Sequence, residues 1–94
     1  MAINENIRRE IAEFNEGSMV FDNPAFDNSI IGMTTDDQVV YDYDKMVEEM
    51  MLDDNISQEE AADWIQFNSS RSIHYAGKLA PIIMFRFMED AYGN

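Results

Sequence analysis

The chain contains no cysteine among its 94 residues, which excludes disulfide bonds and thiolate metal sites. This absence fits a reducing cytoplasm, where we expect the protein to reside. The only histidine is His74, so there is no second histidine for a metal cluster. The longest apolar run, at residues 79–85, is far shorter than the roughly 20 residues that a membrane-spanning helix needs. The N-terminal sequence also lacks the apolar core of a secretory signal.

Basic residues are scarce as well. Six lysines and arginines stand against 19 aspartates and glutamates, which gives a net charge of −13. Polyanions such as DNA, RNA and anionic lipid favour lysine and arginine, so we expect neither direct nucleic-acid binding nor membrane binding. However, 46% of the residues are apolar and 12% are aromatic, which is not the composition of a disordered acidic chain. We therefore expect one small folded domain over residues 1–94.

The first part of this domain is expected to be a helix followed by a loop. Apolar residues recur at helical spacing over about residues 4–15, where Ile7, Ile11 and Phe14 form one stripe. Residues 17–28 are rich in turn formers and are expected to be a loop. Its apolar residues are expected either to tuck under the loop or to form a short edge strand; they are Met19, Val20, Phe21 and Phe26.

The compact part of the domain, residues 29–88, is expected to begin with a β-hairpin. Residues 29–33 and 38–41 are short β-type runs on either side of a four-residue hairpin loop at 34–37.

Two helices are expected to follow the hairpin. The first is capped by Asp42 or Asp44 and reaches about Asp53, with its apolar residues on one face. The second begins at the capping-box sequence of residues 57–60, which is the clearest local signal in the chain. It is expected to stop before Gly77.

The last element falls at residues 79–88, where β-branched and aromatic residues alternate in a strand-like way. A C-terminal helix that starts at Pro81 and extends over 81–91 is the competing interpretation. With the strand, the order of elements is α-β-β-α-α-β. The sequence therefore predicts a small α+β domain in which helices pack against a mostly antiparallel sheet.

The strongest functional signal is the acidic segment between Asp36 and Asp63. It holds eleven carboxylates and one basic residue, Lys45. One interpretation is a solvated surface that only keeps the protein soluble, although such surfaces usually mix both signs of charge. The other is a rigid negative surface that docks into a basic groove, as a DNA mimic would. Eight of the carboxylates form four adjacent doublets, at residues 36–37, 48–49, 53–54 and 59–60.

The second interpretation assigns partner binding to most of these acids. The doublet at residues 59–60 is left out, because capping the following helix explains it without a partner. The acidic residues that we expect to bind a partner are Asp36, Asp37, Asp42, Asp44, Glu48, Glu49, Asp53 and Asp54.

A second candidate patch is polar and nearly uncharged. Asn68, Arg71 and Tyr75 lie toward the end of the helix that follows the acidic segment, close to the histidine. The functional interpretation makes these three residues, together with His74, a small recognition patch. The structural interpretation pairs Arg71 with a nearby acid and uses Asn68 as a cap.

Apolar residues on the two central helices offer a third candidate surface. Met46, Met50 and Met51 recur at helical spacing and are either an adaptable binding face or, more commonly for such a stripe, part of the core. Trp64 and Phe67 are about 300° apart around a helix. We therefore expect one of these two rings to be more exposed than its size suggests.

Metal-dependent and catalytic interpretations are weaker. Asp53, Asn55 and Ser57 match the first positions of a calcium-binding EF-hand loop, but Gln58 and Trp64 stand where a glycine and a bidentate glutamate are required. Paired carboxylates of a glycosidase need a pocket and one raised pKa, whereas these acids follow turns and polar helix faces. We expect no catalytic residue, no metal site and no cofactor.

Several segments together resemble a group of known proteins. They are VYDYDKM at residues 40–46, SQEEAA at 57–62, WI at 64–65, Asn68, Arg71, YAG at 75–77 and APIIM at 80–84. Over residues 29–85 the chain is similar to small acidic proteins encoded in genomes and prophages of low-GC Gram-positive gut bacteria. No catalytic residues come with that resemblance. As a class, phage-borne proteins of this size and acidity also resemble anti-CRISPR and other anti-defence inhibitors, many of which occupy the DNA-binding channel of a nuclease or surveillance complex.

The functional expectation is therefore a phage or mobile-element anti-defence inhibitor, above all of the anti-CRISPR kind, that is not an enzyme. Its partner would be a protein with a basic surface, such as a CRISPR effector nuclease or surveillance complex. It would act in the host cytoplasm, as a monomer or homodimer. The alternative is a non-inhibitory interaction module of phage or host, a regulator or assembly subunit, that binds through a Met/aromatic surface.

Overall fold

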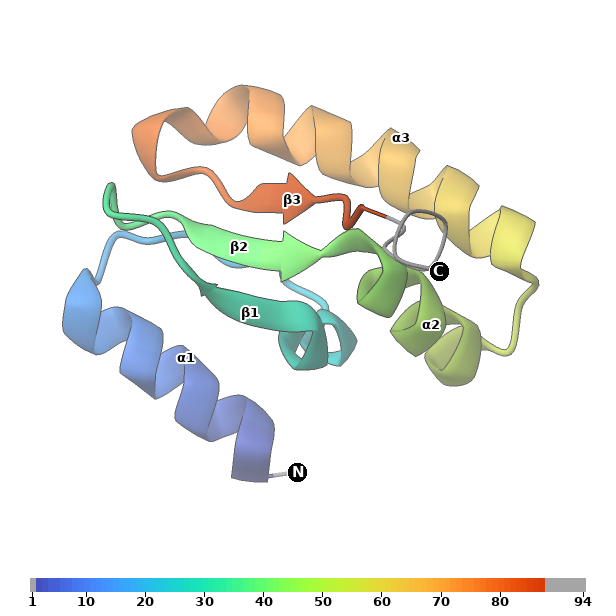
Figure 1. Ribbon diagram of the computed structural model, residues 1–94, viewed down its shortest axis with the longest axis horizontal. Coiled ribbons are helices and arrows are strands. Elements are labelled where there is room, and N and C mark those ends of the chain that lie inside the picture. Colours follow the sequence, from blue (N-terminus) through green and yellow to red (C-terminus); the bar gives the residue numbers. More distant parts are fainter. Residues whose placement is uncertain (1, 88–94) are drawn as a thin grey trace.

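The computed structural model describes the backbone of residues 2–87 and the side chains of residues 6–68 and 77–87. Its elements follow the order α-β-β-α-α-β, with two short 3-10 helices added (Figure 1). This order confirms the predicted α+β class. The elements are α1 (Ala2–Phe14), η1 (Pro24–Ser29), β1 (Ile30–Met33), β2 (Val39–Asp42), α2 (Tyr43–Asp54), α3 (Gln58–Ala76), η2 (Gly77–Leu79) and β3 (Ile82–Met84).

The three strands form one sheet in the order β1-β2-β3. β1 and β2 are the antiparallel arms of the predicted hairpin, while β3 pairs parallel with the other edge of β2. The parallel pairing follows from the connection, because α2 and α3 together carry the chain back to the start of β2 before β3 begins. The register shifts between Ile30 and Gly32 of β1, which marks a β-bulge at this edge of the sheet.

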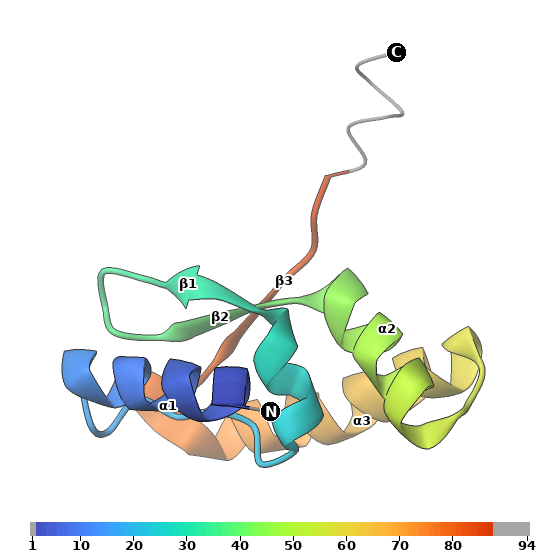
Figure 2. The same cartoon turned by 90° about the horizontal axis from the view of Figure 1, so that it is seen from below.

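The core lies between the sheet and the helices. Figure 2 shows α1 and α3 on the same side of the β1–β2 hairpin. Val39 and Tyr41 of β2 are fully buried. Ile30 and Ile83 are the register partners of Tyr41 on the two flanking strands, and both pack against the same core. The buried apolar residues of this core are Ile11, Phe21, Phe26, Val39, Tyr41, Met46, Val47, Met50, Ala61 and Ile65.

The boundaries of α2 and α3 confirm the capping predictions. The Asp42 side chain accepts a hydrogen bond from the backbone N–H of Asp44 at 3.1 Å and so caps α2. Asn55 ends α2 with a left-handed backbone conformation, φ 55°. Ser57 and Glu60 exchange the two hydrogen bonds of a capping box at 3.2 Å each. Local side-chain chemistry therefore fixes where both helices begin.

The strand predicted over residues 79–88 is shorter than expected. Only Ile82–Met84 form β3, whereas Leu79 belongs to η2 and residues 85–87 lie outside any strand. The reason is the length of β2: Met84 pairs with Asp42, which is the residue that caps α2. Beyond that point β3 has no strand to pair with. The strand interpretation is thus confirmed over this short stretch, and residues 88–91 lie outside the described part of the chain.

Two open alternatives about apolar residues are also decided. Phe21 and Phe26 are buried in the core, so the loop tucks its aromatic rings inward, and the segment ends in a 3-10 helix capped by Asn23. Met46 and Met50 are buried as well, which confirms the core interpretation of the methionine stripe.

One ion pair joins α1 to the loop and to η1. Arg8 donates from Nε to Asp27 Oδ2 at 2.6 Å, and from Nη2 to Asp27 Oδ1 at 2.9 Å and to the carbonyl oxygen of Phe21 at 2.8 Å. The Asp27 side chain is 0% exposed. The hydrogen bond to Asp27 raises the pKa of Arg8. The bidentate contact with Arg8 satisfies the buried Asp27 carboxylate. Without Arg8, the carboxylate would be a buried charge with no cation beside it.

We expect Arg8→Ala to lower the free energy of unfolding by about 3–5 kcal/mol, because it leaves the Asp27 carboxylate buried without a cation. Urea unfolding followed by circular dichroism measures this loss. Arg9→Ala is the matched control, since Arg9 is exposed on the same helix and its loss should change stability by less than about 0.5 kcal/mol. The double variant Arg8→Met/Asp27→Leu should recover most of the stability. Equal losses for Arg8→Ala and Arg9→Ala would contradict the expectation.

Tyr41 anchors the same loop from the sheet. Its hydroxyl oxygen accepts a hydrogen bond from the backbone N–H of Phe21 at 2.9 Å, and the two rings lie 4.7 Å apart. The side chain is fully buried. Burial penalises the charged phenolate and raises the pKa of Tyr41 to about 12.

This pKa shift predicts a loss of stability at high pH. An unfolded tyrosine releases its proton near pH 10, whereas the folded protein holds the Tyr41 proton until about pH 12. Between these values the folded state binds more protons, so the free energy of unfolding should fall as the pH rises. Below pH 10 the contribution is fully present. Urea unfolding at a series of alkaline pH values measures the slope, and Tyr41→Phe should lack this part of it. An identical slope in that variant would refute the assignment.

Candidate partner-binding surface

The first acidic doublet, Asp36 and Asp37, lies apart from the other three. It occupies the hairpin turn at one end of β2, and α2 leaves from the opposite end (Figure 1). The four residues of β2 alone span roughly 13 Å at about 3.3 Å per residue. Asp37 also has a structural role, because its carboxylate accepts from Asn15 Nδ2 at 3.2 Å and its carbonyl accepts from Ser18 Oγ at 2.6 Å. These contacts tie the hairpin to the loop after α1.

Asp42 and Asp44, at the start of α2, share one cation, Arg86, which follows β3. Arg86 Nε lies 3.0 Å from Asp42 Oδ2, and Arg86 Nη2 lies 3.6 Å from Asp44 Oδ2. Asp42 is buried and caps the helix, while Asp44 is exposed. Both carboxylates also lie at the helix N-terminus, where the helix dipole favours negative charge. Helix stability therefore explains their presence without a partner.

The second doublet, Glu48 and Glu49, is held by Lys45 one turn earlier. Lys45 Nζ lies 3.2 Å from Glu48 Oε1 and 3.5 Å from Glu49 Oε2. The hydrogen bond to Glu48 raises the pKa of Lys45. Glu49 is mostly covered and accepts a further hydrogen bond from Asn28 Nδ2 at 2.8 Å, whereas Glu48 projects into solvent. Of this doublet only Glu48 is open to a partner.

The third doublet, Asp53 and Asp54, is different. Both residues are exposed in the last turn of α2, where the helix dipole disfavours negative charge by about 0.3–1 kcal/mol per residue. The last turn contains no basic residue. Among the described side chains, neither aspartate forms an ion pair. This doublet costs helix stability and receives no compensation within the described structure.

The fourth doublet, Glu59 and Glu60, lies in the first turn of α3. That position is favourable for carboxylates, and Glu60 also completes the capping box. One turn later Asp63 is exposed, and the described side chains offer it no ion pair either. Asp63 is not among the acids that are predicted from the sequence to bind a partner.

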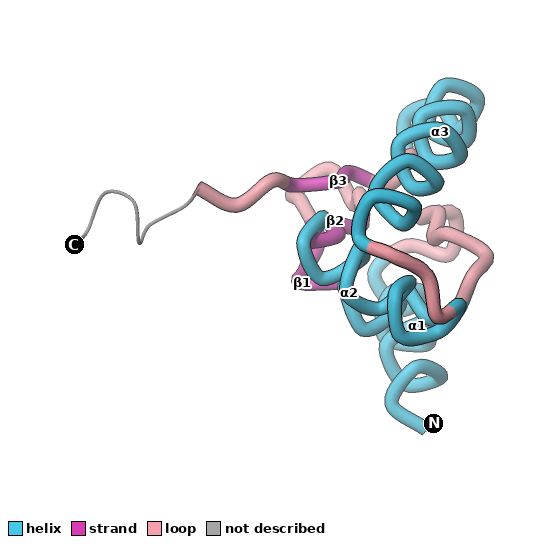
Figure 3. Tube along the Cα trace, turned by 90° about the vertical axis from the view of Figure 1, so that its right-hand side faces the viewer, coloured by secondary structure: helices cyan, strands magenta, loops and turns pink. Residues whose placement is uncertain are grey.

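Helices α2 and α3 bring several of these acids around one concave surface, which we call the α2–α3 groove. The two helices pack against each other and are joined by a short loop (Figure 3). The groove has an open volume of about 630 Å³. Its apolar floor includes Trp64 and Phe67, which are 41% and 63% exposed. Both rings are thus more exposed than aromatic residues usually are. The groove is lined by Met50, Asp54, Ile56, Glu60, Asp63, Trp64, Phe67 and Asn68.

The polar patch of Asn68, Arg71 and Tyr75 is only partly described. Asn68 lines the groove, and its Nδ2 donates to the backbone carbonyl of Trp64 at 2.9 Å. Arg71 and Tyr75 lie in α3. Their side chains, like that of His74, are outside the described part of the structure. Their part in partner binding stays a prediction.

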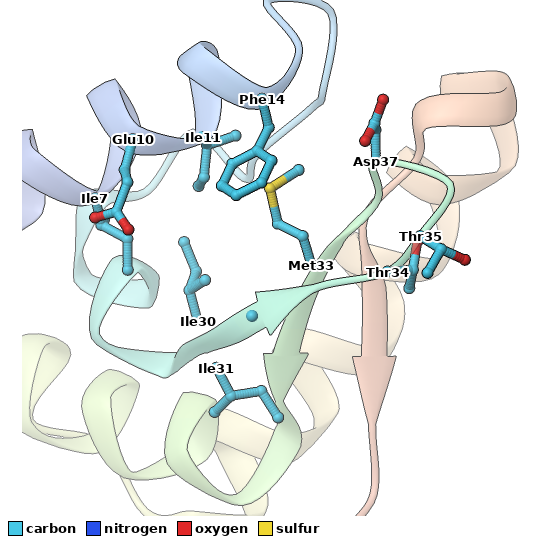
Figure 4. Close-up of a pocket in the computed structure, with 11 residues that line it drawn as sticks. Ile7, Glu10, Ile11, Phe14, Ile30, Ile31, Met33, Thr34, Thr35 and Asp37 are labelled. Carbon is cyan, nitrogen blue, oxygen red and sulfur yellow. The ribbon is translucent and has the colours of Figure 1, made fainter.

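A second groove lies between α1 and the edge strand β1, with a volume of about 580 Å³ (Figure 4). Figure 4 shows Ile11, Phe14 and Met33 projecting into the space between the helix and the strand. Its ionisable lining residues are Glu10 and Asp37, and the rest of its lining is mainly apolar. With two carboxylates in a mainly apolar lining, this groove does not fit a partner that binds through positive charge. It lies on the hairpin side of the fold.

In the part of the chain that the structure describes, no three histidine or acidic side chains come together in a way that could hold a metal ion. Over the same residues, none of the helices combines the length and apolar character needed to cross a membrane.

Comparisons with protein-family models, with curated proteins and with solved structures gave no match. The resemblance to prophage-encoded proteins therefore stays a prediction.

Removing the charges of Asp53 and Asp54 should make the protein more stable. In Asp53→Asn/Asp54→Asn we expect the free energy of unfolding to rise by about 1 kcal/mol at low salt, because the helix dipole no longer opposes two negative charges. Urea unfolding measures the change, which should shrink at high salt. Glu59→Gln is the matched control: it also removes negative charge from an exposed residue, but at a helix N-terminus, and should lower stability. If both changes stabilise the protein, relief of its overall negative charge is the cause instead.

Proposed function

We propose that the protein is a stoichiometric inhibitor that binds the basic, nucleic-acid-binding surface of a partner protein. The contact would be made by exposed carboxylates at the end of α2 and the start of α3. The observation that carries this proposal is the exposed pair Asp53 and Asp54, which stands in the last turn of α2, where no residue is basic and no described side chain forms an ion pair with either aspartate. Because the pair destabilises its own helix, a partner's cations are what would stabilise it.

The other acids support this choice of surface by contrast. Asp42 and Asp44 are paired with Arg86, and Glu49 is paired with Lys45 and mostly covered. Bringing a second cation to an already paired carboxylate gains less than bringing one to an unpaired carboxylate. The chain's net charge of −13 adds long-range attraction, which would make association with a basic surface fast and dependent on salt.

The specific form that we propose is anti-defence activity, with an anti-CRISPR protein of the host cytoplasm as its leading case. Lysines and arginines that hold target DNA in an effector nuclease are spaced to meet phosphates, and a small rigid acidic protein can meet the same cations. Blocking them requires binding alone and no catalytic residue. The size and the net charge of the chain support this form.

A second candidate function is favoured by a different observation. Exposed Trp64 and Phe67 give the same end of the molecule an apolar surface, which suits a non-inhibitory regulator or assembly subunit. Salt distinguishes the two candidates, because the Debye length falls to about 3 Å at 1 M salt. A complex held by charge alone should dissociate there, whereas an apolar contact should persist.

Charge reversal at the proposed surface should weaken inhibition. We expect Asp53→Lys/Asp54→Lys to lose about tenfold or more in potency, equivalent to about 1.4 kcal/mol or more, when DNA cleavage by purified CRISPR effectors is titrated with the protein. Lysines at a helix C-terminus are favourable, so the variant should stay folded.

The control for this test is Glu13→Lys/Asp36→Lys, which changes the net charge by the same amount at exposed residues of α1 and the hairpin turn. This control should keep most of its potency. Equal losses in the two variants would show that net charge, rather than this surface, determines binding. Undiminished inhibition by Asp53→Lys/Asp54→Lys would exclude the proposed surface altogether.

A further inference from the structure

The α2–α3 groove contains an aromatic ring that the core holds in place. The rings of Trp64 and Phe26 lie 6.0 Å apart at an interplanar angle of 47°, and Phe26 is buried in the core. One side of Trp64 is thus supported by a fixed neighbour, while 41% of the residue stays exposed. An aromatic side chain that is already ordered loses little conformational entropy when a partner covers it, and such rings are typical anchors of protein interfaces.

Apolar side chains from both helices and from the loop between them surround this ring. Met50 is buried, Ile56 is partly covered, and Phe67 is 63% exposed. Together with Trp64 they form an apolar floor within the open volume of about 630 Å³, which is large enough for one or two side chains of a partner. Polyanion mimicry requires none of this apolar surface, because phosphate-binding sites recognise charge.

The rim of the groove is acidic on both sides. Asp54 comes from the end of α2, and Glu60 and Asp63 come from the first turns of α3. No lysine or arginine is among the described residues that line the groove. An occupant must therefore place apolar atoms on the floor and positive charges at the rim. A purely apolar ligand would leave the rim unpaired, and an acidic one would be repelled.

We propose that the α2–α3 groove binds an amphipathic basic segment of the partner protein. One apolar side chain of that segment packs against Trp64 and Phe67, while lysines or arginines on either side of it meet Asp54 and Asp63. This inference rests on the proposed function, which requires the basic partner, and adds the apolar anchor that the partner must carry. Charge then brings the two proteins together, and burial of the anchor slows their separation.

Trp64 provides a direct test, because it is the only tryptophan in the chain. The probes are two synthetic helical peptides of about 14 residues with identical lysines. One carries leucines along a single face and the other carries serines at the same positions. The leucine peptide should shift the Trp64 emission to shorter wavelength and bind about tenfold or more tightly than the serine peptide, as burial of one apolar side chain predicts.

Variants identify the groove as the place of binding. Phe67→Ala should weaken binding of the leucine peptide by about tenfold and leave the affinity for the serine peptide unchanged. Leu52→Ala is the matched control, since Leu52 is 75% exposed on α2 but does not line the groove, and it should bind both peptides like the unaltered protein. Asp63→Asn should weaken the binding of both peptides by the same factor, because it removes only a charge. Urea midpoints confirm that each variant is folded.

Equal affinities for the two peptides, or binding of the leucine peptide without a change in Trp64 emission, would overturn the inference. So would failure of both peptides to bind. The proposed inhibitory function is judged separately by the cleavage assay. If Asp53→Lys/Asp54→Lys loses inhibition while Phe67→Ala retains it fully, the charge mechanism stands and the apolar anchor is refuted.

Discussion

The arrangement of the whole molecule depends on the contact between Arg8 and the buried Asp27. Through it α1 is fastened to η1, and the same guanidinium holds the carbonyl of Phe21 in the preceding loop. η1 in turn packs against α2 and places Phe26 in the core. Phe26 then supports Trp64 on α3. The ion pair between α1 and η1 thus contributes to the fixed position of the aromatic ring in the α2–α3 groove.

The negative charge of the chain is distributed in a way that helix electrostatics explains only in part. Carboxylates in the first turns of α2 and α3 stabilise those helices, and Lys45 and Arg86 neutralise several others. Asp53 and Asp54 oppose the dipole of their own helix. If the acids served only solubility, they could lie at helix N-termini, where they would not destabilise a helix. The position of this pair, rather than the total charge, is therefore the feature that calls for a functional explanation.

Features of the sequence that act over a few residues predicted the structure well. Asp42 and the capping box of Ser57 and Glu60 define helix starts through contacts within three residues, and the hairpin joins strands that are adjacent in sequence. The order of elements followed from these local signals. Their reliability has a physical basis, because each cap is satisfied by atoms that lie close along the chain.

Contacts between distant residues could not be predicted in the same way. Arg8 and Asp27 are 19 residues apart, and neither belongs to a recognisable motif. The parallel pairing of β3 with β2 depends on how α2 and α3 reverse the direction of the chain. The sequence of residues 82–84 does not specify that reversal. For the candidate site, the doublets were visible as charge, but their separation depends on β2: it places Asp36 and Asp37 at one end of the sheet and α2 at the other.

If the protein acts as proposed, the acidic rim and the aromatic floor of the α2–α3 groove restrict which partner proteins can bind it. A surface that only reproduced the charge of DNA would bind many basic proteins with similar affinity, because long-range attraction discriminates little between them. An ordered tryptophan in the same groove as Asp54, Glu60 and Asp63 adds a requirement that a purely charged basic surface does not meet. A basic surface without an apolar residue at the right place leaves Trp64 and Phe67 exposed and gains only the electrostatic part of the free energy. Specificity would then come from the few apolar atoms of the groove, while the many carboxylates supply the rate of association.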